Sequence, residues 1–375
     1  MTKQETNLKN TSIKRSLQKV QDFKERKIES QWYNLRPILG NANWALFYIL
    51  LGGREAGKSY SVTNFFVDQW KHKGIPFTWL RLTETAARKL LQNNAERLVD
   101  PDLRRKYDLD LITNGNNVYE VTKRSKPDKN GKTKIVEKKL MARVYAISTF
   151  YNDKGSIFDN EFLDDPNMRY NVAIDEFERE KGEKNNFDIL YSLVNQLENL
   201  LRSTKDRTKI FFLGNTLEEA SDILCAFNFI PEEFGVFKLK SKRCVIHNIE
   251  PSEAYKERRK GTIADILMPT ASTFTNKIDT DKTLINKKQL VAPSYVIKFT
   301  KDKSNWFTVW DSNIVCKYNG EKKSVIAMRP YLDEVFSPDI QKNMITLFDT
   351  RSLQFRNLIT FKQFQSQMEL LKPRK

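Results

Sequence analysis

The chain has 375 residues, of which 39% are hydrophobic, 11% aromatic and 30% charged. This composition excludes disordered and fibrous proteins and predicts two or three globular domains. Lysine and arginine number 64 against 47 acidic residues, so the net charge of +17 predicts a polyanionic partner. No apolar run approaches the roughly 20 residues of a membrane span, so we expect no membrane partner. The cysteines and histidines lack the spacing of a zinc site.

Residues 1–28 predict a basic amphipathic helix that precedes the first domain. The apolar side chains Ile13, Leu17, Val20 and Phe23 recur at roughly helical spacing, with lysine and arginine between them. Such a helix could pack on its own domain, on a neighbouring subunit or near nucleic acid. The sequence does not distinguish these partners.

Residues 29–228 alternate short apolar runs with amphipathic helices, which is typical of a parallel sheet covered on both faces. We expect strands at residues 44–51, 77–82, 172–174 and 210–213, and helices at residues 59–71, 86–98 and 187–201. This part of the chain is therefore predicted to be an α/β domain.

Two strand-like runs within residues 118–147 interrupt this pattern and predict a β-hairpin with a long basic tip. A basic tip can contact the phosphates of a nucleic acid, or it can be a solvated surface loop. The candidate contacts are Lys123, Arg124, Lys126, Lys129, Lys132 and Lys134.

An eight-residue phosphate-loop pattern follows the first apolar strand and opens the first helix, which is the context that this motif requires. Its residues are Gly52, Gly53, Arg54, Glu55, Ala56, Gly57, Lys58 and Ser59. The glycines allow the backbone to wrap around phosphates, Lys58 reaches the β- and γ-phosphates, and the Ser59 hydroxyl binds magnesium. The loop predicts ATP and Mg²⁺ as cofactors.

Asp175 and Glu176 directly follow the apolar run at residues 172–174. At the end of a neighbouring strand, Asp175 can hold the metal and its water shell, and Glu176 can polarise the attacking water. The long gap after Lys58 leaves room for an extra strand between the two motif strands, which residues 77–82 are expected to fill. These features predict the additional-strand, catalytic-glutamate (ASCE) class of phosphate-loop ATPases.

Other polar residues are candidates for contacts with the γ-phosphate. Asn215 ends the apolar run at residues 210–213 and is a candidate sensor, although a helix cap is an alternative role. Arg202 follows the helix at residues 187–201 and is a candidate arginine finger for an adjacent subunit, with surface solvation as the alternative. Lys154 is a second candidate for that role, and Arg54 could act within its own site.

The run Asn276-Lys277-Ile278-Asp279 matches the guanine-recognition pattern of GTPases. It follows a stretch rich in serine and threonine instead of an apolar strand. We therefore expect no guanine specificity.

The pattern changes after Asn228. We expect a linker at residues 229–250 and a second, smaller α/β domain at residues 251–375. Three closely spaced strands are predicted at residues 295–299, 306–310 and 314–318, with a further strand at 325–328 and helices from residue 337 onward.

Together these motifs resemble the DNA-packaging ATPases of small short-tailed phages, which are relatives of the large terminase subunits. The matching positions are residues 52–59, Arg81, Asp175-Glu176-Phe177, Arg179-Glu180-Lys181, Arg202 and Leu213-Gly214-Asn215. The resemblance implies catalytic roles for Lys58, Ser59, Asp175 and Glu176. It also implies that Arg202 and Lys154 are donated to a neighbouring site.

By this resemblance the protein is an ATP-driven motor that moves double-stranded DNA into a preformed prohead. The motor is a homomeric ring, commonly a pentamer, which acts in the host cytoplasm and transiently at the portal vertex. Whether a structural RNA joins the assembly stays open. Two alternatives also remain: another ring-forming nucleic-acid ATPase, such as a helicase or DNA-transfer pump, and an assembly factor switched by ATP.

The resemblance further implies that the second domain is RNase H-like. A two-metal nuclease needs clustered carboxylates, with one normally on the first strand. Residues 294–301 contain no aspartate or glutamate, and Asp311 is a lone nearby acid. We therefore expect this domain to lack nuclease activity.

Overall fold

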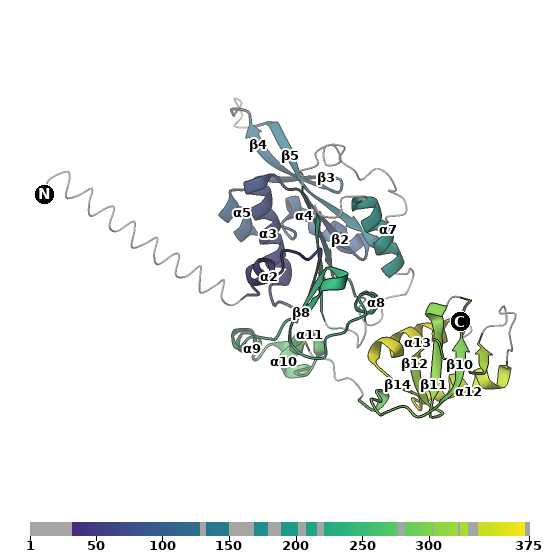
Figure 1. Cartoon of the computed structure of the whole chain (residues 1–375). Helices are drawn as coiled ribbons and strands as arrows, with labels where there is room; N and C mark the ends of the chain where they lie inside the picture. Colours follow the sequence, from purple (N-terminus) through teal and green to yellow (C-terminus); the bar gives the residue numbers. More distant parts are fainter. Residues whose placement is uncertain are drawn as a thin grey trace. The chain divides into compact units, whose positions relative to one another are not determined.

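The computed structural model describes residues 32–127, 133–149, 169–178, 189–201, 208–215, 221–276, 282–301, 303–321, 323–328 and 337–371 (Figure 1). The chain divides into two compact units. Unit 1 comprises Met1–Leu217 and Glu233–Lys277, and unit 2 comprises Glu218–Glu232 and Ile278–Lys375. None of the helices in the described ranges has the length and hydrophobicity to cross a membrane. The helix expected at residues 1–28 lies outside the described residues.

Unit 1 is built on a nine-stranded sheet with the order β3-β4-β5-β2-β6-β7-β1-β9-β8. The strands are β1 (Phe47–Leu51), β2 (Phe77–Arg81), β3 (Leu111–Asn114), β4 (Asn117–Arg124), β5 (Ile135–Ala146), β6 (Tyr170–Asp175), β7 (Thr208–Gly214), β8 (Gly235–Leu239) and β9 (Cys244–Asn248). Neighbouring strands from β5 to β9 in this order pair in parallel. β3, β4 and β8 add antiparallel pairs at the two edges. The expected α/β fold with a mostly parallel sheet is confirmed.

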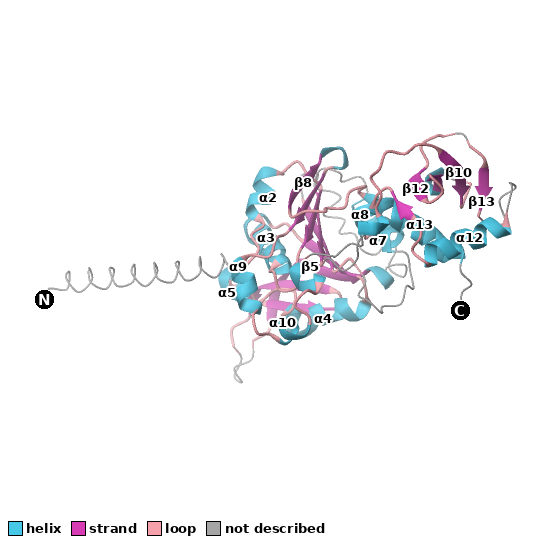
Figure 2. Ribbon diagram, turned by 90° about the horizontal axis from the view of Figure 1, so that it is seen from below, coloured by secondary structure: helices cyan, strands magenta, loops and turns pink. Residues whose placement is uncertain are grey.

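Helices cover both faces of this sheet, as Figures 1 and 2 show for α3 on one face and α7 on the other. The helices of unit 1 are α2 (Arg36–Asn41), α3 (Lys58–Lys73), α4 (Glu84–Ala95), α5 (Pro101–Tyr107), α7 (Ile189–Leu201), α9 (Glu253–Arg259), α10 (Ile263–Leu267) and α11 (Ser272–Thr275). Tyr48 and Leu50 share a buried cluster with Val62 and Phe66 of α3. Because side chains alternate between the two faces along a strand, the side chain of Ile49 lies on the opposite face of the sheet.

Phe66 fixes α3 against the sheet. Its buried ring lies 5.1 Å from the ring of Phe77 and 6.1 Å from that of Trp79, both on β2. It also lies 5.3 Å from the ring of Phe211 on β7, at 70°. Edge-to-face contacts of this kind add to the free energy of apolar burial. Phe66 therefore holds the helix that begins at Lys58 in a fixed position over two strands.

The strand order corrects the expected position of the extra strand. β7 lies between β1 and β6, whereas β2, expected to fill that position, lies on the far side of β6. Every β7 residue except Lys209 is buried, as suits an interior strand. A strand thus separates the two motif strands, but it comes from residues after Asp175.

The expected linker at residues 229–250 was wrong. This segment contains β8 and β9, and β9 pairs in parallel with β1 along its whole length. Cys244, Val245 and Ile246 are fully buried, and they cover an edge of β1 that would otherwise expose its backbone hydrogen-bonding groups. Unit 1 therefore continues to Lys277, and the second domain does not begin at residue 251.

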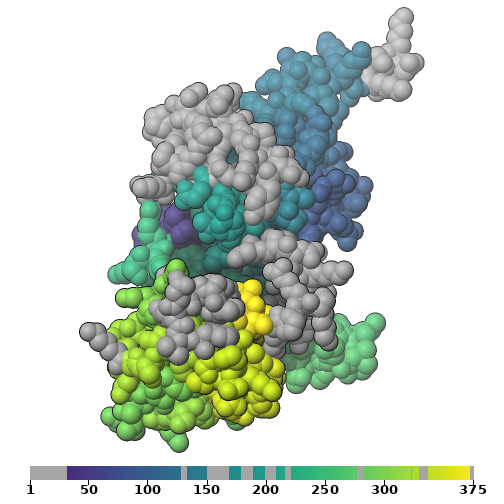
Figure 3. Space-filling view, turned by 90° about the vertical axis from the view of Figure 1, so that its right-hand side faces the viewer, coloured from purple at the N-terminus to yellow at the C-terminus, as the bar shows by residue number. Residues whose placement is uncertain are grey.

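β4 and β5 form the expected hairpin, which projects from the sheet as an arm (Figures 1 and 3). Residues 142–146 of β5 also pair in parallel with β2, so the same strand belongs to both the arm and the main sheet. Lys123, Lys126 and Lys134 are exposed on the arm. Arg124 is exposed but donates two hydrogen bonds to Asp110, at 2.6 and 3.0 Å. Lys129 and Lys132 lie outside the described residues.

Unit 2 contains a five-stranded sheet with the order β13-β10-β11-β12-β14. Its elements are α8 (Asp222–Ala226), β10 (Pro293–Lys298), β11 (Trp306–Trp310), β12 (Ile314–Lys317), β13 (Val325–Ala327), α12 (Pro338–Asp349), β14 (Gln354–Phe355) and α13 (Leu358–Leu371). β10, β11 and β12 form an antiparallel meander, and β13 lies parallel to β10. Phe364 of α13 packs edge-to-face on Phe299 and Phe307 in the core.

The packing at the end of β7 predicts the effect of a small substitution. A Cβ atom added at Gly214 would lie 2.6 Å from Cε1 of the buried Phe177 ring. We expect Gly214→Ala to lower the free energy of unfolding by about 1–3 kcal/mol, because the overpacked ring must move. Urea unfolding followed by circular dichroism measures this change.

Gly40→Ala is the matched control. Gly40 lies in α2, and its added Cβ would meet no atom within 4 Å. This substitution should leave stability unchanged or raise it by about 0.5–1 kcal/mol, since alanine favours the helix. Equal urea midpoints for the Gly214→Ala variant and the wild type would contradict the described packing.

Candidate active site

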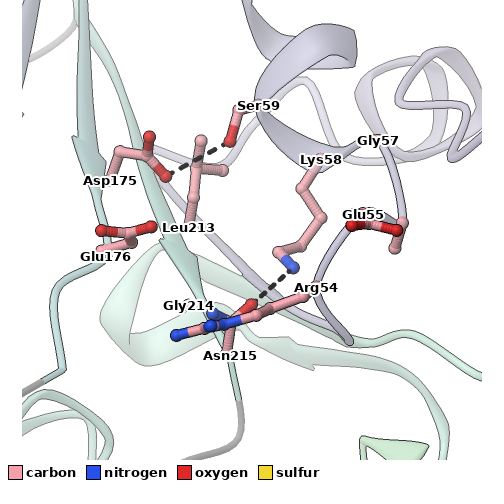
Figure 4. Close-up of a pocket in the computed structure, with 11 residues that line it drawn as sticks. Arg54, Glu55, Gly57, Lys58, Ser59, Asp175, Glu176, Leu213, Gly214 and Asn215 are labelled. Carbon is pink, nitrogen blue, oxygen red and sulfur yellow. Dashed lines mark hydrogen bonds between the residues drawn. The ribbon is translucent and has the colours of Figure 1, made fainter. Parts of the chain in front are cut away.

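A pocket of about 540 Å³ opens at the carboxyl ends of β1, β6 and β7 (Figure 4). In an open parallel sheet this edge is where ligands bind, because loops and helix N-termini converge there. The pocket is lined by Arg54, Glu55, Ala56, Gly57, Lys58, Ser59, Asp175, Glu176, Leu213, Gly214 and Asn215. The structure thus brings most of the expected phosphate loop together with both expected carboxylates and the expected sensor.

Lys58 is the most enclosed cation of this pocket, with 7% of its surface exposed. It is the first residue of α3, directly after Gly57, whose φ of 89° is easily reached only by glycine. Its Nζ atom donates hydrogen bonds to the carbonyl oxygens of Gly52 at 2.7 Å and Gly53 at 2.9 Å, and to Oδ1 of Asn215 at 3.2 Å. Lys58 therefore links the phosphate loop to the residue that follows β7.

Burial lowers the pKa of Lys58 to about 8. The negative charges of Asp175, Glu176 and Glu178 oppose this shift, but desolvation of the ammonium group is the larger effect. An anion placed in the pocket would favour the charged form. The site thus holds a cation that a phosphate ligand can stabilise.

Ser59 and Asp175 provide a pair of oxygen atoms suited to magnesium. The Ser59 hydroxyl donates a hydrogen bond of 3.3 Å to Oδ1 of Asp175 (Figure 4). Adjacent oxygen ligands of Mg²⁺, each about 2.1 Å from the ion, are separated by about 3 Å. The donor set therefore fits Mg²⁺, with water or phosphate oxygens completing its shell.

Arg81 pairs with both candidate carboxylates, a role that the sequence analysis did not predict. It is the last residue of β2, and it stands opposite Asp175 in the register of β2 with β6. Its Nη1 atom lies 2.7 Å from Oδ2 of Asp175, and its Nη2 atom is hydrogen-bonded to the Glu176 carboxylate. Glu176, which has a left-handed backbone conformation with φ of 54°, is thus held in an ion pair with Arg81.

The remaining candidates divide by position. Asn215 lines the pocket and is bound by Lys58, whereas the residues that it was alternatively expected to cap lie outside the described ranges. The side chain of Arg54 extends across the pocket toward Asn215 (Figure 4). Arg202 and Lys154 lie outside the described residues.

Asn276, from the dismissed guanine pattern, has a structural position. Its buried Nδ2 group donates hydrogen bonds to Oδ1 of Asn248 at 2.9 Å and to the carbonyl oxygens of Ile249 at 2.8 Å and Leu51 at 3.3 Å. It thus joins the carboxyl ends of β1 and β9. These contacts explain why an asparagine stands there without a role in reading a base.

The fold has counterparts among solved structures. It is similar to the viral genome packaging motor assembly of bacteriophage Phi-29, with a TM-score of 0.62 and 17% sequence identity over 91% of this chain and 99% of that one. It is also similar to the gp11 DNA packaging motor of Phi-28, with a TM-score of 0.59 and 15% identity over 92% and 99% of the two chains.

The chain has the fold of phage DNA-packaging motors. The likeness extends over nearly the full length of both counterparts, so it includes both units. The resemblance drawn from the motifs is thereby confirmed at the level of the fold. No protein-family model matches the sequence, and no curated protein sequence matches it significantly.

The lowered pKa of Lys58 predicts proton uptake when a nucleoside triphosphate binds. The phosphates favour the ammonium form and raise a pKa that is about 8 in the free site, so affinity should fall as pH rises above about 8. Calorimetry in two buffers of different ionisation enthalpy should show uptake at pH 8.5 and almost none at pH 6.5.

Lys58→Arg tests the assignment, because arginine stays protonated throughout this range. Any binding that this variant retains should occur without proton uptake at pH 8.5. Uptake equal to that of the wild type would assign the titrating group elsewhere.

Proposed function

We propose that the protein is a Mg²⁺-dependent ATPase that drives double-stranded DNA into a viral prohead. The observation that carries this proposal is the meeting of Lys58, Ser59, Asp175 and Glu176 in one pocket. That pocket lies in a fold shared with two structures described as DNA packaging motors. The basic net charge of the chain suits a DNA substrate.

Five side chains of the pocket and the amides of the loop have roles in this proposed hydrolysis. The loop amides and Lys58 bind the β- and γ-phosphates and balance their charge. Ser59 and Asp175 hold Mg²⁺, which neutralises phosphate charge when it is bound. Glu176 accepts the proton of the attacking water, and its carboxylate must first turn from Arg81 toward that water. Asn215 exchanges its contact with Lys58 for one with the γ-phosphate.

The position of β7 between β1 and β6 supports assignment to the ASCE class, which is named for such an inserted strand. We further propose a homomeric ring, of five subunits as is common in the family, at the portal vertex of the prohead in the host cytoplasm. Arg202 and Lys154 would be the residues donated to the neighbouring site. Hydrolysis would then depend on assembly, because each site is completed by the next subunit.

The arm formed by β4 and β5 is the proposed DNA contact. Its exposed lysines include Lys123, Lys126 and Lys134, and on a projecting hairpin they can reach phosphates without reading bases. Arg124 contributes less, because Asp110 already neutralises it.

Unit 2 is proposed to be an RNase H-like domain without nuclease activity. Its antiparallel meander, with a fourth strand parallel to the first, supports that fold. β10 carries no acidic residue, and Asp311 lies in the turn between β11 and β12. Within the described ranges, no group of three or more acidic, histidine or cysteine side chains is arranged to hold a metal.

Two substitutions test the ATPase assignment. Lys58→Ala should abolish ATP binding, since the phosphates lose their buried cation. Glu176→Gln should retain binding but lower the turnover number about a hundredfold or more, because the general base is lost. Binding of a fluorescent ATP analogue and phosphate release, each measured with and without DNA, provide both quantities.

Two outcomes would count against this assignment. Wild-type turnover by Glu176→Gln would remove Glu176 from the role of base. Slow wild-type turnover that DNA does not accelerate would favour an ATP-switched assembly factor over a motor.

The arm predicts a change in the salt dependence of DNA binding. Each lost phosphate contact lowers the slope of log affinity against log salt by about 0.9. Replacing Lys123, Lys126 and Lys134 by serine should therefore lower the slope by roughly 2 to 3. Fluorescence anisotropy with a DNA duplex over a series of salt concentrations measures it.

The matched control replaces three exposed lysines at the opposite edge of the same sheet, namely Lys238, Lys240 and Lys242. This variant loses the same charge and should keep the wild-type slope. A slope reduced by the control substitutions but not by those on the arm would move the DNA contact to the β8 edge.

A further inference from the structure

The carbonyl oxygens of residues 52–56 in the phosphate loop all accept hydrogen bonds. Those of Gly52 and Gly53 accept hydrogen bonds from Lys58 inside the pocket. The next three are held by residues that do not line the pocket. The Arg54 carbonyl accepts from the Tyr255 hydroxyl at 2.7 Å, the Glu55 carbonyl from Nη2 of Arg258 at 2.8 Å, and the Ala56 carbonyl from the backbone amide of Tyr33 at 3.0 Å.

Two of these donors belong to α9, which also neutralises a side chain of the loop. Nη1 of Arg259 lies 3.0 Å from Oε2 of Glu55. We refer to Tyr255, Arg258 and Arg259 as the α9 clamp. All three reach a segment about 200 residues earlier in the chain. Tyr255 bonds to residue 54, and the two arginines bond to residue 55.

The clamp residues are themselves held in place. The Arg258 guanidinium lies 3.9 Å from the centre of the Trp32 ring, and that of Arg259 lies 3.7 Å from the centre of the Phe274 ring. Stacking of this kind orders a guanidinium group while leaving its N–H groups free to donate. Tyr255 and Arg259 are buried, so little side-chain freedom remains to be lost.

The loop needs external support because its conformation is unfavourable on its own. Glu55 has a φ of 61°, in the left-handed region that disfavours residues with a Cβ. Such a residue persists only where surrounding contacts hold it. The hydrogen bonds to its carbonyl and to the preceding one supply that support.

We propose that Tyr255, Arg258 and Arg259 are positioning residues of the nucleotide site. They hold the backbone at Arg54 and Glu55 so that the loop amides face the phosphates before the nucleotide arrives. This inference rests on the proposed binding of ATP. It assigns to α9 a part of the affinity that the phosphate-loop pattern alone would assign to residues 52–59.

The consequence is a split between binding and catalysis. The clamp contacts the loop from outside and does not line the pocket, so it acts on ground state and transition state alike. Weakening it should raise KM and Kd for ATP with little change in kcat, which is the signature of lost uniform binding. A residue that only stabilises the fold would change the unfolding midpoint and leave Kd unchanged.

Tyr255→Phe tests this split, because it removes a single hydroxyl group. We expect Kd and KM for ATP to rise about fivefold and kcat to stay within about twofold, since one hydrogen bond is lost from the bound conformation. Tyr107→Phe is the matched control: it removes a hydroxyl that donates to Oδ1 of Asn64 on α3 at 2.9 Å. The control should lower the unfolding midpoint by a similar amount and keep the wild-type Kd.

Arg259 provides a second test, independent of Tyr255. Arg259→Ala leaves the Glu55 carboxylate unpaired beside the phosphates, so ATP affinity should fall severalfold and the loss should shrink at high salt. Arg259→Lys should retain most of the affinity. Adding Glu55→Gln to the alanine variant should restore part of it.

The outcomes separate the clamp from the function on which it rests. If the wild type binds ATP and both Tyr255→Phe and Arg259→Ala bind it equally well, the clamp is overturned and the ATPase assignment stands. A wild type that binds no ATP would overturn the proposed function itself. Circular dichroism of the same samples measures the fraction of folded protein. If the apparent Kd of the variants rises only in proportion to a loss of that fraction, the clamp residues stabilise the fold and do not position the loop.

Discussion

The ammonium group of Lys58 is buried where a loop, a helix and a strand meet. Burial costs this cation its hydration, and the fold of unit 1 offsets that cost with polar partners. Two loop carbonyls and the Asn215 side chain accept hydrogen bonds from the ammonium group, while the carboxylates at the end of β6 balance its charge. These groups meet only if β1, β7 and β6 are adjacent and in register, as the sheet order provides. The packing of Phe66 on the sheet then fixes the position of α3, and therefore the position of Lys58 at its first turn.

The residues of the pocket could be predicted from the sequence because each stands next to a recognisable apolar run. Lys58 and Ser59 come after β1 and its loop, Asp175 and Glu176 stand at the end of β6, and Asn215 follows β7. Parallel strands bring their carboxyl ends to one edge. The ion pairs of Arg81 were not predicted. The partner of a basic residue at the end of a strand depends on which strand lies beside it, and the sequence does not give the strand order. The order itself depends on tertiary pairing, which is why β2 was placed wrongly.

The end of unit 1 was misplaced for a related reason. β8 and β9 are short, and the segment that joins them, residues 240–243, is polar and basic, so the sequence resembles a linker. They are strands because β1 offers a parallel edge and because Asn276 ties the ends of β1 and β9 together. The contacts of α9 with the loop were equally hidden, as they join residues about 200 positions apart. Sequence patterns report local conformation well, but they say little about pairing over such separations.

β5 has a mechanical consequence. It is one continuous strand of 12 residues, about 40 Å long at 3.3 Å per residue. One end lies in the exposed arm, and the other end is paired residue by residue with β2, so that Ala146 stands beside Arg81. The hydrogen bonds between β5 and β2 resist sliding of one strand past the other. A force applied to the arm is therefore transmitted to β2, whose last side chain, Arg81, pairs with Asp175 and Glu176. A single strand therefore connects the arm to the carboxylates of the pocket, and the bulges in its pairing with β4 lie between the two ends.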